Sequence, residues 1–245
     1  MGYGGLPGYG PPQPPPGGGL GPPPYGQPGG APIDWTPAGA MQLAWQRLRA
    51  DAGGVLLPLG IALAIEALPG IVGTRFQPHS DDPLRQFQPD ALRTTMLFNL
   101  IALAVRSFFD GGVNRFCLDV ARGRRYELGT IFSGVSLFPL YFALNIVQSF
   151  AVGLGLLLFV VPGVILALGF AVAEPALVDR RLGPIAALSW SWEHTKGQRV
   201  KLLVWSLLVI VAAMLGACAC GVGLFVAVPV IWIARAHIYV CLGGG

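Results

Sequence analysis

The sequence has few charged residues. Only 11% of its 245 residues are Asp, Glu, Lys or Arg, whereas 53% are hydrophobic and the mean hydropathy is +0.62. Soluble domains carry about a quarter of their residues as charges, so this composition excludes an ordinary water-soluble domain. We expect lipid, not water, to surround most of the chain.

Residue types that build catalytic and metal sites are also scarce. The four cysteines and three histidines are scattered along the chain, which excludes a disulfide framework and a zinc site. We find no nucleophile and base pattern and no phosphate-binding glycine loop. The sequence therefore predicts no catalytic residues, no cofactor and no bound metal.

The first 35 residues form a separate segment. Residues 1–32 contain 12 Gly, 11 Pro and no charge, and such a composition cannot bury enough apolar surface to offset the cost of ordering the chain. We expect a disordered cytoplasmic tail. Two interpretations stay open: a proline-rich ligand for a protein partner, or a low-complexity segment without one. Because the first 40 residues lack a positively charged start and an apolar run, we expect no cleavable signal peptide.

The stretch from Ser133 to Asp179 organises the rest of the chain. Its 45 residues between Gly134 and Val178 include one charged residue, Glu174, and one membrane crossing needs only about 20 residues. We expect two helices joined at Gly153 and Gly155, with Pro162 as a kink in the second. Residues 36–245 then read as an all-α, polytopic membrane bundle of six spans, at about 54–72, 91–112, 134–152, 156–178, 200–217 and 222–242.

Short amphipathic helices are predicted before three of the spans. Thr36 and Pro37 form a helix start, after which Met41, Trp45 and Leu48 share one face. Further interfacial segments are expected at 128–135 and from 184 to about 196.

The placement of Lys and Arg predicts orientation. Eleven basic residues flank the spans on one side and three on the other, and cytoplasmic loops carry the basic excess. We expect both termini in the cytoplasm of a bacterium, with the chain in its inner membrane.

An internal repeat also appears. Residues 155–162 and 222–229 align without gaps at an offset of 67, and each ends in proline. The unit is two spans, and an even number of crossings preserves orientation, so we expect parallel two-helix repeats.

Several motifs recur in a recognisable order: 118–124, 131–134, 161–163, 178–180, 187–192 with 195–197, and 228–229. Over residues 40 to 242 the chain resembles a group of bacterial six-helix integral membrane proteins of unknown function, similar to the membrane domain of some glycerophosphodiester phosphodiesterases. The resemblance implies a six-helix protein of the cytoplasmic membrane. The phosphodiesterase catalytic domain is absent, so that activity is not implied.

Among the charged residues of the predicted spans, four are candidates for an intramembrane polar site: Glu66, Arg106, Glu174 and Arg235. Each costs a few kcal/mol at membrane depth unless it is paired or hydrated. One interpretation is a polar site for a headgroup, an anion or a proton. The other is a set of charges that join helices or reach the interface.

Three hypotheses for function follow. The first is a non-enzymatic membrane component that binds lipids, a protein through the tail, or further copies of itself. The second is a small transporter with a polar site in the cytoplasmic half of the bundle. An enzyme comes third, and nucleic acid is not an expected partner. Convergence of the four charges on one cavity would favour transport, and local pairing would favour the first hypothesis.

Overall fold

The computed structural model describes residues 34–76, 89–218 and 223–243, and across these ranges it is helical, with no strand. The predicted all-α class is confirmed, and six segments are long and apolar enough to cross a membrane. The predicted tail lies outside the described residues except for Asp34 and Trp35. The helices are α1 (Pro37–Ala50), α2 (Ala52–Phe76), α3 (Pro89–Arg122), η2 (Leu128–Leu137), α4 (Phe138–Leu158), α5 (Val160–Gly169), α6 (Ala173–Arg180), α7 (Pro184–His194), α8 (Arg199–Cys218) and α9 (Leu224–Cys241).

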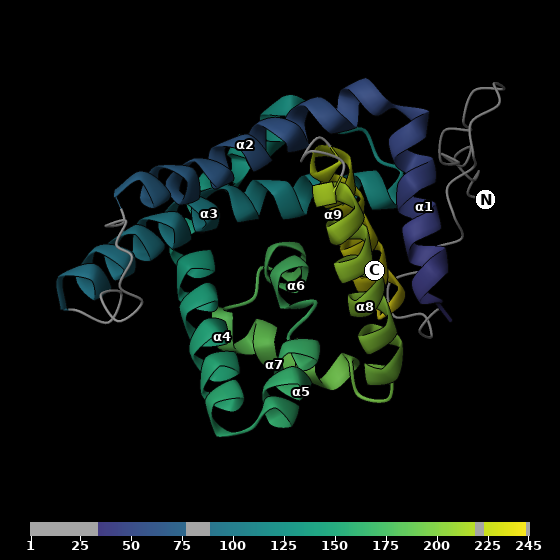
Figure 1. Cartoon of the computed structure of the whole chain (residues 1–245). Coiled ribbons are helices and arrows are strands. Elements are labelled where there is room, and N and C mark those ends of the chain that lie inside the picture. Colours follow the sequence, from purple (N-terminus) through teal and green to yellow (C-terminus); the bar gives the residue numbers. More distant parts are fainter. Residues whose placement is uncertain (1–33, 77–88, 219–222, 244–245) are drawn as a thin grey trace, which may run out of the picture.

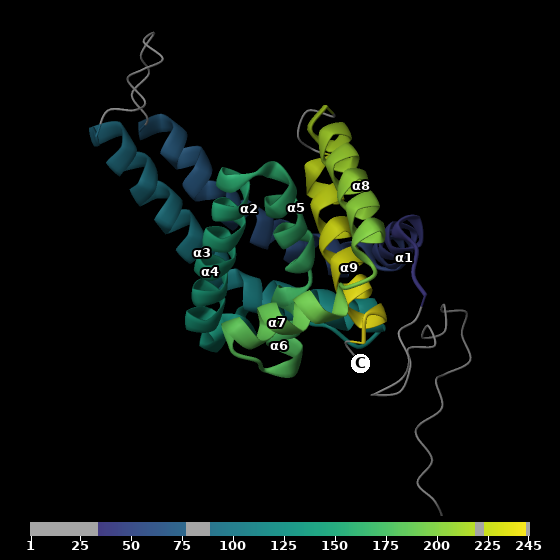
Figure 2. The same ribbon diagram turned by 90° about the horizontal axis from the view of Figure 1, so that it is seen from below.

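Three helical hairpins form the body of the protein (Figure 1). They are α2 with α3, α4 with α5, and α8 with α9, and in Figure 2 all three turn back at the same end of the molecule. We call the opposite end, which holds α6, α7 and the C-terminus, the base. The shared direction of the second and third hairpins agrees with the parallel repeat.

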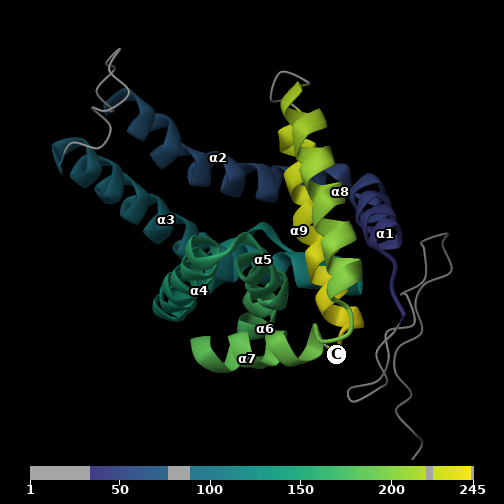
Figure 3. The same cartoon turned by 60° about the horizontal axis from the view of Figure 1, so that its bottom comes forward.

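Helix α1 lies across α8 and α9 and is seen almost end-on in Figure 3. Thr36 begins it as predicted, because its hydroxyl accepts a hydrogen bond from Gly39 N at 3.1 Å. Of the predicted apolar face, Leu48 is buried and Met41 packs against the core, and Ala40 and Ala44 are buried as well. Trp45 instead is 38% exposed. Small alanines allow α1 to approach α9 closely, which the bulk of a tryptophan would prevent.

Helix α3 crosses η2 at two glycines. A Cβ atom on Gly112 would overlap the carbonyl of Ile131, and one on Gly134 would overlap the backbone at Gly111 and Gly112. Gly111 and Gly112 do not interrupt α3. The lack of a side chain at Gly112 and Gly134 lets the backbones of α3 and η2 approach each other closely. The segment predicted at 128–135 is helical and forms η2, and α3 continues beyond the predicted span boundary at residue 112.

The turn between the third and fourth spans lies at Phe159, not at the predicted Gly153 and Gly155. Phe159 adopts an extended conformation between α4 and α5. Pro162 is then the third residue of α5, where its missing N–H costs no helical hydrogen bond, so it is not a kink. Gly155 lies against Gly163 of α5, and its role is close packing of the two helices.

The fourth span is broken, which the sequence did not predict. Helix α5 ends at Gly169 and α6 begins at Ala173. Ser191 of α7 donates to Gly169 O at 2.7 Å and accepts from Val172 N at 3.4 Å, and Thr195 also donates to Gly169 O. Backbone groups inside a membrane protein need partners of this kind wherever a helix is interrupted. The break sets the direction of α6 and hence of Glu174.

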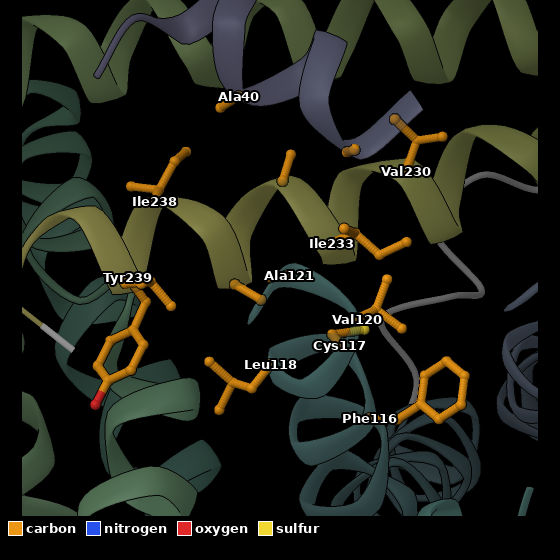
Figure 4. Close-up of a cluster of buried hydrophobic side chains, with 14 of the residues drawn as sticks. Ala40, Phe116, Cys117, Leu118, Val120, Ala121, Val230, Ile233, Ile238 and Tyr239 are labelled. Carbon is orange, nitrogen blue, oxygen red and sulfur yellow. The ribbon is translucent and has the colours of Figure 1, made fainter. Parts of the chain in front are cut away.

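The main core joins α1, α2, α3 and α9. Figure 4 shows α9 packed between α3 and α1, with Ile233 and Tyr239 on the side of Val120 and Leu118 and Ile238 on the side of Ala40. Cys117 and Cys241 are buried free thiols in this core. This core fixes the C-terminal half of α3 against α9 and so positions the polar groups described next.

Candidate functional site

A stripe of polar side chains runs along α3. Arg106, Asp110 and Asn114 follow one another at intervals of four residues, so they lie on one face of the helix. Asp110 and Asn114 are buried, with exposed fractions of 5% and 3%. Helix α6 brings Glu174 and α9 brings Arg235 to this face.

Glu174 is the acceptor at which both arginines meet. Arg235 Nη2 lies 2.7 Å from Glu174 Oε2, and Arg106 Nη2 lies 3.6 Å from Glu174 Oε1. Arg106 Nε also lies 3.7 Å from Asp110 Oδ2, so these two residues pair along α3. Three helices are therefore connected through one set of alternating charges.

Neutral side chains add hydrogen bonds to this set. Asn145 of α4 donates to Asp110 Oδ2 at 2.9 Å, and Asn114 accepts from Arg235 Nη2 at 3.1 Å. Tyr141 of α4 donates to the backbone carbonyl of Glu174 at 2.8 Å. We call Arg106, Asp110, Asn114, Asn145, Glu174 and Arg235 the polar centre.

The structure thus brings together three of the four predicted residues, Arg106, Glu174 and Arg235. The fourth, Glu66 of α2, lies beside them and lines a separate cavity of about 400 Å³ with Arg106 and Asn99. Asn114 and Asn145 were not predicted as site residues, because only charged side chains were singled out within the spans. Asn114 has a usable signal, since it continues the spacing of Arg106 and Asp110 by one more turn.

A second cavity, of about 530 Å³, opens at the base between α3, η2, α4 and α6. We call it the basic pocket. Ser133 and Ser136 contribute hydroxyl groups to its wall. Its charged lining residues are Arg115, Asp119, Arg122, Arg124, Asp179 and Arg181.

One wall of the basic pocket is held rigidly. Arg122 donates to both carboxylate oxygens of Asp179, at 2.6 and 2.7 Å, and Tyr239 donates to Asp179 Oδ2 at 2.9 Å. This two-point pairing between a guanidinium and a carboxylate is strong and directional. It ties the end of α3 to α6 and α9 and neutralises Asp179.

The remaining arginines of the pocket are available to a ligand. Among the described residues, Arg115, Arg124 and Arg181 are exposed and form no ion pair within 4.0 Å. Four arginines against two aspartates leave the lining with a net charge of +2. In the sequence these arginines are recognisable only as orientation signals, because their convergence depends on the break before α6.

Comparison with known proteins gives relatives without an assigned role. The chain is 29% identical to Uncharacterized protein Rv2560 of Mycobacterium tuberculosis, in an alignment that covers 92% of this chain and 74% of the relative. Uncharacterized protein Mb2590 of Mycobacterium bovis matches with the same identity and coverage. No family model and no solved structure matches. The resemblance to the phosphodiesterase membrane domain stays a prediction.

Proposed function

We propose that this multi-pass membrane protein is a non-enzymatic component of the bacterial inner membrane that binds an anionic lipid headgroup in the basic pocket. In this proposal the base faces the cytoplasm, in line with the positive-inside distribution of Lys and Arg. The observation that carries it is the convergence of Arg115, Arg124 and Arg181, without ion-pair partners among the described residues, on one cavity of about 530 Å³.

The chemistry of the lining supports a phosphate group. Guanidinium groups bind phosphate through paired, charge-assisted hydrogen bonds, and the hydroxyl of Ser136 adds a neutral donor, whereas that of Ser133 already donates to Thr130 O at 2.6 Å. Basic pockets between membrane helices on the cytoplasmic side are typical sites for phosphate-bearing headgroups. The net charge of +2 suits a ligand that carries one or two negative charges.

The surroundings of the pocket support a lipid as the source of that phosphate. Phe132 and Val135 of η2 are 55% and 44% exposed, and they alternate along the helix with the pocket residues Ser133 and Ser136. Leu137 and Leu140 add apolar surface to the lining itself. A lipid can therefore place its headgroup among the arginines and its acyl chains along η2 and α4.

Native mass spectrometry of protein extracted from its own membrane in mild detergent tests the proposal. We expect a phospholipid with net negative charge to be retained by the wild type and lost from Arg115→Gln/Arg124→Gln. The matched control is Arg49→Gln/Arg125→Gln, which removes two exposed arginines that do not line the pocket and should keep the lipid. Equal retention by both double variants would contradict the proposal.

Transport is the second candidate function, and one observation favours it: Glu66 and Arg106 line a common cavity. The remaining predicted charges, Glu174 and Arg235, pair with each other in the polar centre, as the first hypothesis expects. Uptake of labelled solutes into vesicles containing Glu66→Gln and wild-type protein would separate the two candidates. A protein partner for the tail stays a prediction.

A further inference from the structure

We propose that the cavity between α2 and α3 binds one exchangeable monovalent cation, a proton or an alkali-metal ion, at the carboxylate of Glu66. The cavity has a volume of about 400 Å³. Glu66 lines it from α2, and Asn99 and Arg106 line it from α3. The remaining lining residues are apolar: Leu63, Ala67, Ala102 and Leu103.

Glu66 has a carboxylate oxygen that lacks a hydrogen-bond partner. Its Oε1 atom is buried and has no hydrogen-bond partner among the described residues. The two neighbouring carboxylates are satisfied, because Asp110 accepts from Asn145 and Glu174 pairs with Arg235. A buried carboxylate oxygen without a donor is costly, so a ligand that supplies a positive charge there is favoured.

The charges of Glu66 and its charged neighbours do not cancel. Four charged side chains interact electrostatically with Glu66: Arg106 and Asp110 from α3, Glu174 from α6 and Arg235 from α9. Helix η2, which also packs against α2, carries no ionisable side chain. Three carboxylates against two guanidinium groups leave a net charge of −1. An uncompensated charge inside a membrane is expensive, and one monovalent cation removes it.

Arg106 and Arg235 already form ion pairs with other carboxylates. Arg106 pairs with Asp110 and Glu174, and Arg235 pairs with Glu174. Neither can neutralise Glu66 without giving up a carboxylate of the polar centre. An anion in the cavity would add to the negative surplus, so a cation is the ligand class that the charges select.

The cavity can also satisfy such an ion. The side-chain oxygen of Asn99 and the carboxylate of Glu66 are oxygen ligands, which hard cations prefer. A volume of about 400 Å³ holds several waters at roughly 30 Å³ each, enough to keep an alkali-metal ion partly hydrated. This inference deepens the transport candidate by naming its ion, and it is independent of the basic pocket.

Thermal unfolding of the full chain in neutral detergent tests the inference. Melting temperatures are measured from pH 5 to 9 in N-methylglucamine chloride, and then with added NaCl or KCl at constant ionic strength. For a bound alkali-metal ion, we expect saturating salt to raise the Tm of the wild type by roughly 5–10 °C at high pH. For a proton, Tm falls as pH rises and neither salt restores it.

In both cases Glu66→Gln removes the response, because the neutral amide has no charge to balance. Glu127→Gln, a change of an exposed carboxylate at the start of η2, should respond as the wild type does. Should Glu66→Gln fail to fold, Glu66→Asp decides, since a shorter carboxylate should retain the response with a shifted midpoint. A wild type without any response, a Glu66→Gln curve that follows the wild type, or an unshifted Glu66→Asp midpoint would each overturn the inference.

Discussion

Arg235 of α9 donates to Glu174 of α6 across 2.7 Å, and both side chains are largely buried, with exposed fractions of 17% and 6%. The pair joins two helices through residues that are 61 positions apart in the sequence. Asn114 connects it to α3 by accepting from Arg235, and Arg106 approaches Glu174 from the same helix. The arrangement explains how a bundle with a broken fourth span holds α6 in place.

Removing one member of this pair should be strongly destabilising. Arg235→Met leaves Glu174 with a buried charge and only the weaker contact to Arg106, and the loss of one partner of a buried ion pair costs about 3–5 kcal/mol. Lys201→Met, which breaks the more exposed pair with Asp34, should cost at most about 1 kcal/mol. Reversible unfolding in mixed micelles measures both values. Equal losses would contradict the central position of the Arg235 and Glu174 pair.

The break between α5 and α6 gives a second prediction. Ser191→Ala removes the donor to Gly169 O and the acceptor for Val172 N, and groups left unsatisfied at such a site cost about 1–3 kcal/mol. The neighbouring Ser189 is exposed, so Ser189→Ala should change stability little. The comparison uses the same unfolding experiment. A stable Ser191→Ala variant would mean that Thr195 alone satisfies the break.

The crossing of η2 and α3 is tested by two glycines of η2. Gly134→Ala places a methyl group against the backbone of Gly111 and Gly112, whereas a Cβ on Gly129 meets no atom within 4 Å. Overpacking of this kind typically costs about 1–3 kcal/mol. We expect a lower melting temperature for Gly134→Ala and an unchanged one for Gly129→Ala. Similar values for both would show that η2 is free to shift away from α3.

Asp51, between α1 and α2, gives a prediction about pH. Gly54 N donates to its carboxylate at 2.9 Å and Tyr126 Oη donates at 2.9 Å, and these bonds lower the pKa of Asp51. A lowered folded-state pKa stabilises the fold above the unfolded-state value of about 3.9, and this stabilisation is lost as pH falls below it. The stability difference between wild type and Asp51→Asn should therefore shrink from pH 5 to pH 3. A difference that stays constant across this range would contradict it.

Much of the fold could be predicted from the sequence because lipid imposes long apolar helices. The six spans, the capped start at Thr36 and the helix after Gly183 depend on local composition, and each is confirmed. The turn at Phe159 was placed wrongly although Pro162 lies in the first turn of α5, because glycine, which marks turns, is also used for close helix packing. Gly155 serves close helix contact instead.

The candidate site was predicted in part, for a physical reason. A charged residue in an apolar span can be recognised from the sequence alone, so Arg106, Glu174 and Arg235 could be predicted as site residues. Their convergence depends on the direction of α6, which Ser191 sets from α7. The same break brings Arg181 to the pocket lined by Arg115 and Arg124. Only three-dimensional packing reveals either relationship.

The most direct test of the account is a binding titration of delipidated protein in neutral detergent. The ligands are a short-chain phosphatidylglycerol, the matching phosphatidylcholine and inorganic phosphate. We predict binding of the anionic lipid in preference to the other two, and a loss of affinity of about tenfold or more for Arg124→Gln, since a hydrogen bond to a charged group contributes about 1.5–3 kcal/mol. The adjacent Arg125→Gln, which lies outside the pocket lining, should bind as the wild type does. Equal affinity for both variants, or no preference for the anionic lipid, would contradict the proposed headgroup site.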